Sequence, residues 1–296
     1  MSIREVEEAI SSEVVMDVIQ TLWTHGFLST MERLCLCSYM KNGHEVHLYR
    51  YDNVQGIPEG VVVKDCEEII PRSLFDYKKF INNGTFADYF RYKLLLDRGG
   101  WWVDTDLVAL KPFDFSEEFV FGYMGPWFDD VSTTTPKSVP PRALRRHTQE
   151  LSTGLINPER IVSNNCIKVP AGSRIMKYMW EECCKFDPAK VNWSEDVGPK
   201  LLDKAVKEFG LSSFVKGTHA FNPVYYFHTP RFINPEVRWN FPEDVYAVHL
   251  WNDLWTGRTN WEDKHTWQIT GCPPILQNKE IVIEGSLYGD LVKRYL

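Results

Sequence analysis

The first third of the chain alternates between apolar segments of strand character and a helix, and this rhythm constrains the fold more than any other feature. Residues 14–24 (VVMDVIQTLWT) are apolar and rich in β-branched side chains, and residues 45–52 and 61–65 have the same character. Between the first two, residues 29–43 begin with the Ser and Glu spacing of a capping box and end at Gly. This order predicts an α/β protein with a mainly parallel sheet flanked by helices.

A second helix is expected over residues 85–98 (TFADYFRYKLLLDR), with Thr85 as its N-cap. The segment is apolar on almost every side, so the helix should be buried. The Gly pair at 99–100 ends it, and residues 101–110 (WWVDTDLVAL) begin as a buried strand.

The length of 296 residues and a hydrophobic content of 44% suit one large domain, so residues 1–296 are expected to form a single unit. Residues 127–150 carry three prolines and a group of arginines, which favours an irregular loop or insertion. Further helices are expected near 172–186 and 197–209, as helical additions within about 172–210.

Several classes of protein are disfavoured by composition. The formal net charge of -7 argues against a nucleic-acid partner, because such binding normally rests on a basic surface. The sequence has neither an apolar run of about 20 residues nor a signal peptide, so no transmembrane segment is expected, although binding at a membrane surface stays open. The seven cysteines lack zinc-ligand spacing, which favours reduced thiols and a cytoplasmic location.

The triplet Asp104-Thr105-Asp106 is the strongest candidate for chemistry. Side chains in a strand alternate between two faces, so both carboxylates share a face and can converge on one hard cation where the strand ends. A cation held in this way can neutralise the negative charge of a diphosphate that leaves during a transfer reaction. Two solvated carboxylates at a strand terminus remain the alternative.

Just upstream, Asp88 and Arg91 lie three residues apart on the apolar helix. At this spacing they can form an intrahelical pair. Charges on a helix that is otherwise apolar are costly unless they are paired or used. Structural pairing and substrate contact therefore both stay open.

The segment FADYFRYKLLLDRGGWWVDTDLVALKPFD (86–114) resembles the sugar-binding region of glycosyltransferase family 32 and is similar to the glucosyltransferase domains of large clostridial toxins. Asp and Arg three apart, Gly-Gly, an aromatic residue and D-x-D occur in the family order. Four further segments resemble related transferases: 22–52, 163–173, 196–202 and 247–255. The resemblance implies a GT-A fold, a Rossmann-like domain that binds a nucleotide sugar, with UDP-hexose as donor and Mn²⁺ or Mg²⁺ as cofactor.

The resemblance also implies roles for the acidic residues and the arginine. Asp88 and Arg91 would hold hydroxyls of the donor sugar. Asp104 would contact ribose or sugar and reach the metal through water, which makes these three residues the catalytic set. Asp106 would bind the metal directly.

Other positions are weaker matches. His249 is a candidate metal ligand, since imidazole suits manganese, and a buried histidine at a strand end is its alternative. Trp251 or Trp255 would cover the diphosphate, although their spacing also suits packing. Asn165 is a candidate contact near the sugar. Trp23 would lie beside the base, but Thr-His-Gly follows it where relatives have Ile-Gly-Gly.

By resemblance the reaction is a retaining transfer of a hexose to a hydroxyl of a glycan, a lipid-linked intermediate or a protein, as in polysaccharide biosynthesis. An inverting transferase stays open, with Asp129, Asp130, Glu195 or Asp196 as its base. A nucleotidyltransferase is disfavoured because the glycines near Trp23 are too few for a phosphate-binding loop. A non-catalytic carbohydrate-binding protein is the alternative outside enzymes.

Overall fold

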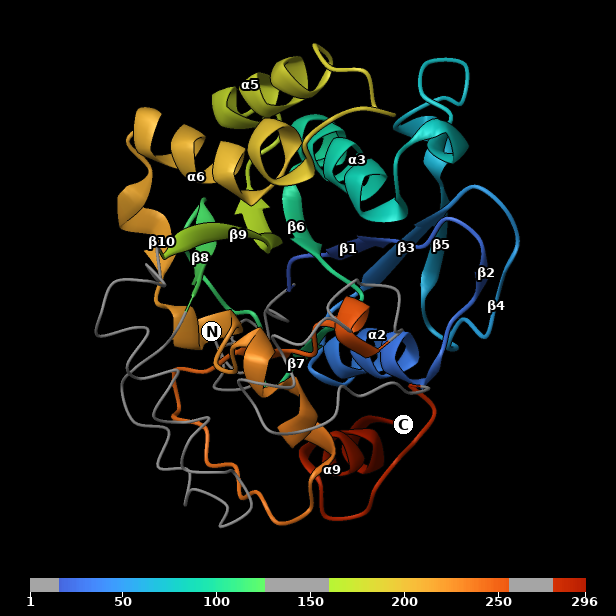
Figure 1. The fold of residues 1–296 in the computed structure, drawn as a ribbon, viewed down its shortest axis with the longest axis vertical. Helices are drawn as coiled ribbons and strands as arrows, with labels where there is room; N and C mark the ends of the chain where they lie inside the picture. The colour runs from blue at the N-terminus through green and yellow to red at the C-terminus, as the bar shows by residue number, and fades with distance from the viewer. Residues whose placement is uncertain (1–15, 126–159, 256–278) are drawn as a thin grey trace, which may run out of the picture.

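The computed structural model describes residues 16–125, 160–255 and 279–296, which form a layered α/β structure around a seven-stranded sheet (Figure 1). In order across the sheet its strands are β10 (Val215–Lys216), β8 (Val120–Met124), β9 (Ile161–Val169), β6 (Gly100–Val103), β1 (Ile19–Leu22), β3 (Val46–Arg50) and β5 (Val62–Asp65). Neighbouring strands are parallel except that β9 is antiparallel to both β6 and β8. The prediction of a mixed, mainly parallel sheet is confirmed.

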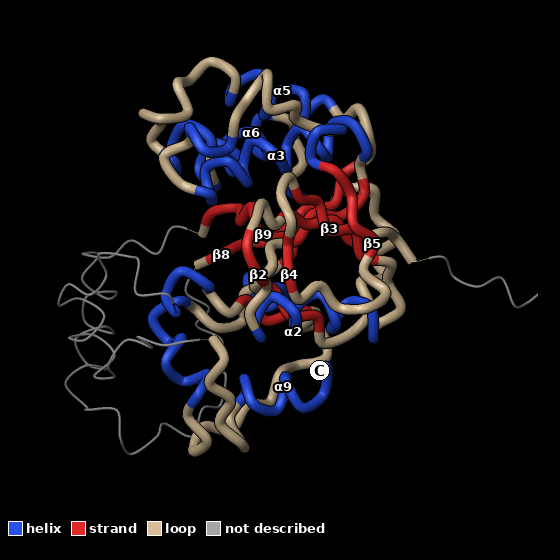
Figure 2. Tube along the Cα trace, turned by 90° about the vertical axis from the view of Figure 1, so that its right-hand side faces the viewer, coloured by secondary structure: helices blue, strands red, loops and turns tan. Residues whose placement is uncertain are grey.

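Helices cover both faces of this sheet (Figure 2). One face carries α3 (Asn83–Arg98), α5 (Arg174–Cys183) and α6 (Pro199–Glu208), and the opposite side carries α2 (Thr30–Lys41) and α9 (Leu287–Tyr295). The helices expected near 172–186 and 197–209 are thus present. The loop expected over 127–150 lies outside the described residues.

Smaller elements complete the fold. Two-stranded sheets pair β7 (Leu107–Ala109) with β11 (Ala247–His249) and β2 (Gly26–Phe27) with β4 (Val54–Gln55). The short helical elements are Cys66–Glu68, Tyr77–Lys79, Trp193–Val197, Ser212–Phe214, α7 (Thr218–Phe221), Tyr226–Ile233 and Asn252–Trp255.

Capping residues explain where the two main helices begin. Ser29 and Glu32 form the expected capping box at the start of α2. For α3 the prediction was wrong: Asn82 is the N-cap, and its side chain accepts a hydrogen bond from the backbone N–H of Thr85 at 2.7 Å. Asparagine is as strong an N-cap as any residue, so the helix starts before Thr85. It ends at Gly99, whose φ of +64° favours glycine.

The expected strand over 101–110 is divided in two. β6 ends at Val103, residues 104–106 form a turn, and β7 leaves the main sheet to pair with β11. The face-sharing argument for the two aspartates therefore does not apply, because they lie in the turn rather than in the strand. Of the strand expected over 14–24, only Ile19–Leu22 forms β1, which pairs with β3.

Tryptophans on β6 show how the sheet is buried. Trp102 packs on the side of α3 and α5, while Trp101 packs on the opposite side with Phe113. This alternation follows from the two-residue period of a strand. The helix α3 is buried as expected, with Phe86 and Phe90 fully enclosed.

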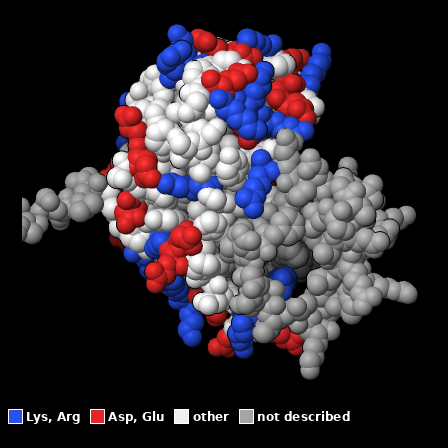
Figure 3. All heavy atoms as spheres, turned by 90° about the vertical axis from the view of Figure 1, so that its left-hand side faces the viewer, with Lys and Arg blue, Asp and Glu red and all other residues white. Residues whose placement is uncertain are grey.

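Charged side chains of both signs share the surface, and the described cysteines are not in disulfides. Lys and Arg side chains lie among Asp and Glu on the face in Figure 3. The described cysteines are free thiols, most of them buried. Within the described ranges, no helix is long and apolar enough to cross a membrane.

Candidate functional site

Three segments far apart in the sequence bring charged side chains together at one end of β6. Helix α3 supplies Asp88 and Arg91, the turn after β6 supplies Asp104 and Asp106, and the end of β11 supplies His249. Because β6 is parallel to β1, this turn lies at the carboxyl ends of parallel strands, where ligands bind in open α/β sheets.

Arg91 is the centre of this arrangement. One of its terminal nitrogens lies 3.3 Å from Asp88 Oδ1 and 3.3 Å from Asp104 Oδ1, so the guanidinium joins the helix to the turn. The other terminal nitrogen donates to the backbone carbonyl of Asn164 on β9. The guanidinium also lies over the ring of Trp102, 5.0 Å from its centroid. Of the two interpretations of the Asp88–Arg91 spacing, the structure shows the intrahelical pair, and substrate contact stays a prediction.

Asp88 is completely enclosed, with 0% of its side chain exposed. Its oxygens accept hydrogen bonds from Asn164 Nδ2 at 2.6 Å and from Trp193 Nε1 at 2.5 Å. Burial raises the pKa of Asp88 to about 7, although Arg91 works in the opposite direction. Both oxygens of this carboxylate therefore already accept hydrogen bonds from the protein.

The two aspartates of the turn differ in environment. Asp104 is 28% exposed and accepts a hydrogen bond from Trp102 Nε1 at 2.8 Å. Burial raises its pKa despite Arg91. Burial acts in the same direction on Asp106, but His249 and the backbone N–H of Asn252 outweigh it and lower the pKa of Asp106. Asp106 is therefore the more acidic of the two carboxylates.

Asp106 and His249 face each other at hydrogen-bond distance. Asp106 Oδ2 lies 3.2 Å from His249 Nε2. Two neighbouring ligands of an octahedral cation, each about 2.1 Å from it, are about 3.0 Å apart, so the pair fits a divalent metal. Among the described residues, no group of three or more His, Cys, Asp or Glu side chains could hold a metal. The protein thus offers a pair of ligands, and Mg²⁺ and similar ions typically take the remainder from water and substrate phosphates.

The backbone at Trp251 builds this corner. Its φ of +59° is positive, which is uncommon for a residue other than glycine. In the next residue, Asn252 N donates to Asp106 Oδ2 at 2.8 Å, while Leu250 N donates to the Asp106 carbonyl. The Trp251 ring lies 4.0 Å from the His249 ring, between centroids. Trp251 is thus at the site.

The other two aromatic candidates, Trp255 and Trp23, lie in different environments. Trp255 is 1% exposed, donates its indole N–H to the Leu250 carbonyl at 2.7 Å and packs on Tyr288. It belongs to the core, so its assignment as a cover for the diphosphate is not supported. Trp23 directly follows β1 and is partly buried, and its buried indole N–H has no hydrogen-bond partner in the described structure. A ligand acceptor could satisfy that donor.

Asn165 is close to the site but engaged within the protein. Its Nδ2 donates to Asn222 Oδ1 at 2.8 Å, and its Oδ1 accepts from Ser163 Oγ at 2.7 Å. Of the candidate bases for an inverting reaction, Glu195 and Asp196 lie in the short helical turn that begins at Trp193, and Asp129 and Asp130 lie outside the described residues.

Sequence reasoning missed three residues that the structure adds to the site, namely Asn164, Trp193 and Asn222. Asn164 lies beside Asn165 on β9, and only Asn165 was a candidate by resemblance. Trp193 was one of eleven tryptophans without any special spacing. Asn222 follows α7 with no motif around it, so no sequence signal pointed to it.

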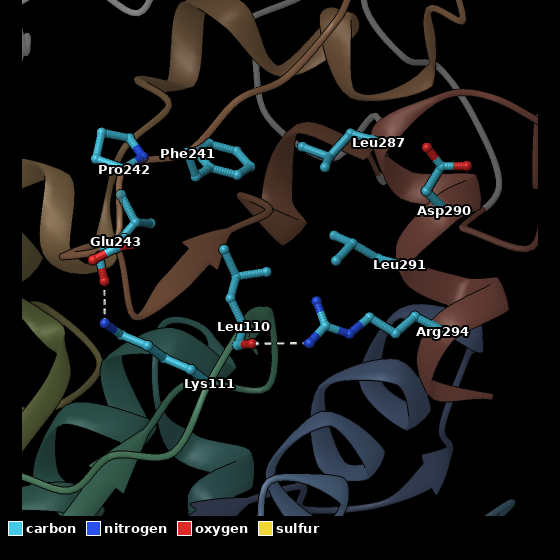
Figure 4. A pocket seen from close by; sticks show the side chains of 10 residues that line it. Leu110, Lys111, Phe241, Pro242, Glu243, Leu287, Asp290, Leu291 and Arg294 are labelled. Carbon is cyan, nitrogen blue, oxygen red and sulfur yellow. Dashed lines mark hydrogen bonds between the residues drawn. The ribbon is translucent and has the colours of Figure 1, made fainter.

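A pocket of about 410 Å³ lies elsewhere, between the end of β7 and α9 (Figure 4). Leu110, Phe241 and Leu291 provide its apolar lining, and Arg294 reaches the Leu110 carbonyl across it at 3.2 Å. None of the carboxylates described above lines it, so it is separate from the candidate site.

Comparisons with known proteins give only a general likeness. No family model matches the chain, and no curated protein sequence does. The chain is similar to the solved structure of PaToxG glycosyltransferase, with 14% identity over 71% of this chain and 77% of that one and a TM-score of 0.43. It is also similar to a transferase mutant with two cysteine-to-serine changes, with 11% identity over 66% and 86% and a TM-score of 0.32. What the chain does must therefore be argued from its own site.

Proposed function

We propose that this protein is a metal-dependent glycosyltransferase that moves a hexose from a nucleotide sugar, UDP-hexose by resemblance, to a hydroxyl acceptor. One observation carries the proposal: Arg91 joins Asp88 to Asp104, and Asp106 faces His249, in a single site at the carboxyl end of β6. These are the residues on which the family resemblance rests. A cation, a guanidinium and hydrogen-bond acceptors suit a sugar diphosphate.

Asp106 and His249 would hold Mn²⁺ or Mg²⁺, which when bound stabilises the charge of the leaving diphosphate. Arg91 provides a fixed positive charge close to the reacting sugar and the phosphates. Asp104, the more exposed carboxylate, orients ribose or sugar hydroxyls. Asp88 holds Arg91 in place, and it contacts the sugar directly when Trp193 moves aside.

The stereochemical proposal is retention without a covalent intermediate, because positioning and leaving-group stabilisation suffice for such a transfer. A glycosylated Asp or Glu found by mass spectrometry with a slow donor analogue would overturn it. The proposed acceptor is a glycan, a lipid-linked intermediate or a protein hydroxyl in the cytoplasm, as in a polysaccharide pathway.

The test is release of nucleotide from a panel of UDP- and GDP-sugars, with and without Mn²⁺. We expect turnover with one donor that depends on the metal. Asp106→Ala should reduce it by at least about 100-fold, since it removes a ligand of the charge-stabilising ion. Asp97→Ala is the matched control, because Asp97 pairs with Lys93 on α3 and contacts none of the site. Near-normal activity of Asp106→Ala refutes the metal assignment, and sugar binding without turnover of any donor favours a lectin-like protein.

A further inference from the structure

A buried chain of hydrogen bonds runs behind His249. Ser163 Oγ donates to Asn165 Oδ1, Asn165 Nδ2 donates to Asn222 Oδ1 at 2.8 Å, and His249 Nδ1 lies 3.1 Å from the same Asn222 oxygen. All four residues are less than a tenth exposed. The chain ends on the imidazole whose other nitrogen faces Asp106.

The orientation of the Asn222 amide follows from its partners. Its Nδ2 lies 3.1 Å from the backbone carbonyl of Tyr123, which can only accept a hydrogen bond. The reversed amide would place oxygen against that carbonyl and would turn its NH₂ group toward the Asn165 NH₂ group. The amide oxygen of Asn222 must therefore face Asn165 and His249.

This orientation determines which nitrogen of His249 carries hydrogen. An amide oxygen cannot donate, so the contact with Nδ1 is a hydrogen bond only if Nδ1 bears the proton. The lone pair of the neutral imidazole is then on Nε2, aimed at Asp106 Oδ2. That oxygen already accepts from Asn252 N. A positive centre between the two atoms, either a proton or a metal ion, makes this 3.2 Å contact favourable.

We propose that Asn222 is a positioning residue for the metal, which holds the proton on Nδ1 of His249 so that Nε2 is the ligand atom. Asn165 and the Tyr123 carbonyl fix Asn222 in turn. Metal-binding histidines usually donate their second N–H to an oxygen, and such partners tune metal affinity. The inference rests on the proposed function, because it assumes that Asp106 and His249 bind a divalent cation.

The experiment is a calorimetric titration of the full chain with Mn²⁺ alone. Asn222→Leu removes the acceptor with little change in volume, and we expect Mn²⁺ to bind about 10- to 100-fold more weakly. Asn222→Asp keeps an acceptor oxygen toward His249 but sets its second oxygen against the Tyr123 carbonyl, so it should recover part of the affinity lost in Asn222→Leu. Ser38→Ala is the control for losing a buried hydrogen bond. Ser38 lies on α2, and its Oγ accepts a hydrogen bond from the backbone N–H of Ala109 on β7. A folded Asn222→Leu protein with wild-type affinity overturns the proposal.

A second measurement needs no variant and covers the case in which Asn222→Leu does not fold. Long-range ¹H–¹⁵N spectra of the wild-type protein with diamagnetic Cd²⁺ should show hydrogen on Nδ1 of His249 and metal on Nε2. Hydrogen on Nε2 overturns the proposal. Failures of the two proposals differ in outcome: a wild-type protein that binds no Mn²⁺ refutes the metal site itself, whereas normal binding by Asn222→Leu refutes only the role of Asn222.

Discussion

Replacing Arg91 by methionine tests the centre of the site, because it removes the charge while keeping much of the side-chain volume. The guanidinium lies 3.3 Å from Asp88 and 3.3 Å from Asp104. With an effective dielectric constant of about 20, each contact amounts to about 5 kcal/mol of Coulomb attraction, most of which offsets desolvation. Leaving a buried carboxylate without its partner costs about 3–5 kcal/mol. That is the loss of unfolding free energy expected for Arg91→Met at pH 8.5.

The loss should depend on pH through Asp88. Its pKa in the folded protein, about 7, is above the ordinary value of 3.8, so stability falls as pH rises through this window and is level above it. Arg91 is what lowers this pKa, and without it the pKa is higher still. The variant therefore continues to lose up to about 1.4 kcal/mol per pH unit above pH 7, where the wild type loses none from this group. Below pH 7, Asp88 is protonated in both folded proteins.

Urea unfolding followed by circular dichroism at pH 6.5 and 8.5 measures both effects. Lys93→Met is the matched control on the same helix, since the partly exposed Lys93–Asp97 pair is worth about 0.5 kcal/mol at either pH. The reasoning fails if Arg91→Met costs no more than Lys93→Met at pH 8.5. It also fails if the gap between them does not widen with pH.

Two further changes probe neighbouring parts of the structure. Trp193→Phe removes the N–H that donates to Asp88 at 2.5 Å. In urea unfolding we expect the unfolding free energy to fall by about 1.5–3 kcal/mol at pH 8.5 and by less at pH 6. Equal losses at the two pH values would contradict a hydrogen bond to an ionised carboxylate. Gly99→Ala places a Cβ 2.3 Å from Ala171 N in a left-handed backbone, whereas Gly43→Ala has open space at a similar φ. Thermal unfolding should show Gly43→Ala costing about 1–2 kcal/mol and Gly99→Ala clearly more, and equal costs would refute the steric argument.

The sequence predicted the layers of the fold well because local patterns determine them. The capping box at Ser29, the apolar helix around Phe90 and the paired tryptophans on β6 each carry their own burial signal. Element ends were less predictable. The start of α3 depended on Asn82, and the break after Val103 depended on β11, a partner strand more than 130 residues away, which no local pattern reveals.

The same distinction applies to the site. Asp88, Arg91, Asp104 and Asp106 fall within one short segment, so their spacing could be read directly. Their partners could not, because amide and indole donors such as Asn164 and Trp193 become site residues only when the tertiary fold aims them at a charge. Trp255 is the opposite case: the resemblance placed it at the site, but its side chain is 1% exposed and packs on Tyr288 in the core.

The balance of charge in the site bears on the order in which ligands bind. Arg91 pairs with Asp88 and Asp104, Asp106 faces His249, and the nearby Lys279 already pairs with Glu32. A nucleotide diphosphate adds further negative charge, and in a partly desolvated site this repulsion is hardly screened. In the proposed function, a divalent cation held by Asp106 and His249 would offset the excess negative charge beside the phosphates. Under the proposed function we therefore expect the donor's affinity to depend on the metal, which binding of the donor with and without Mn²⁺ would measure.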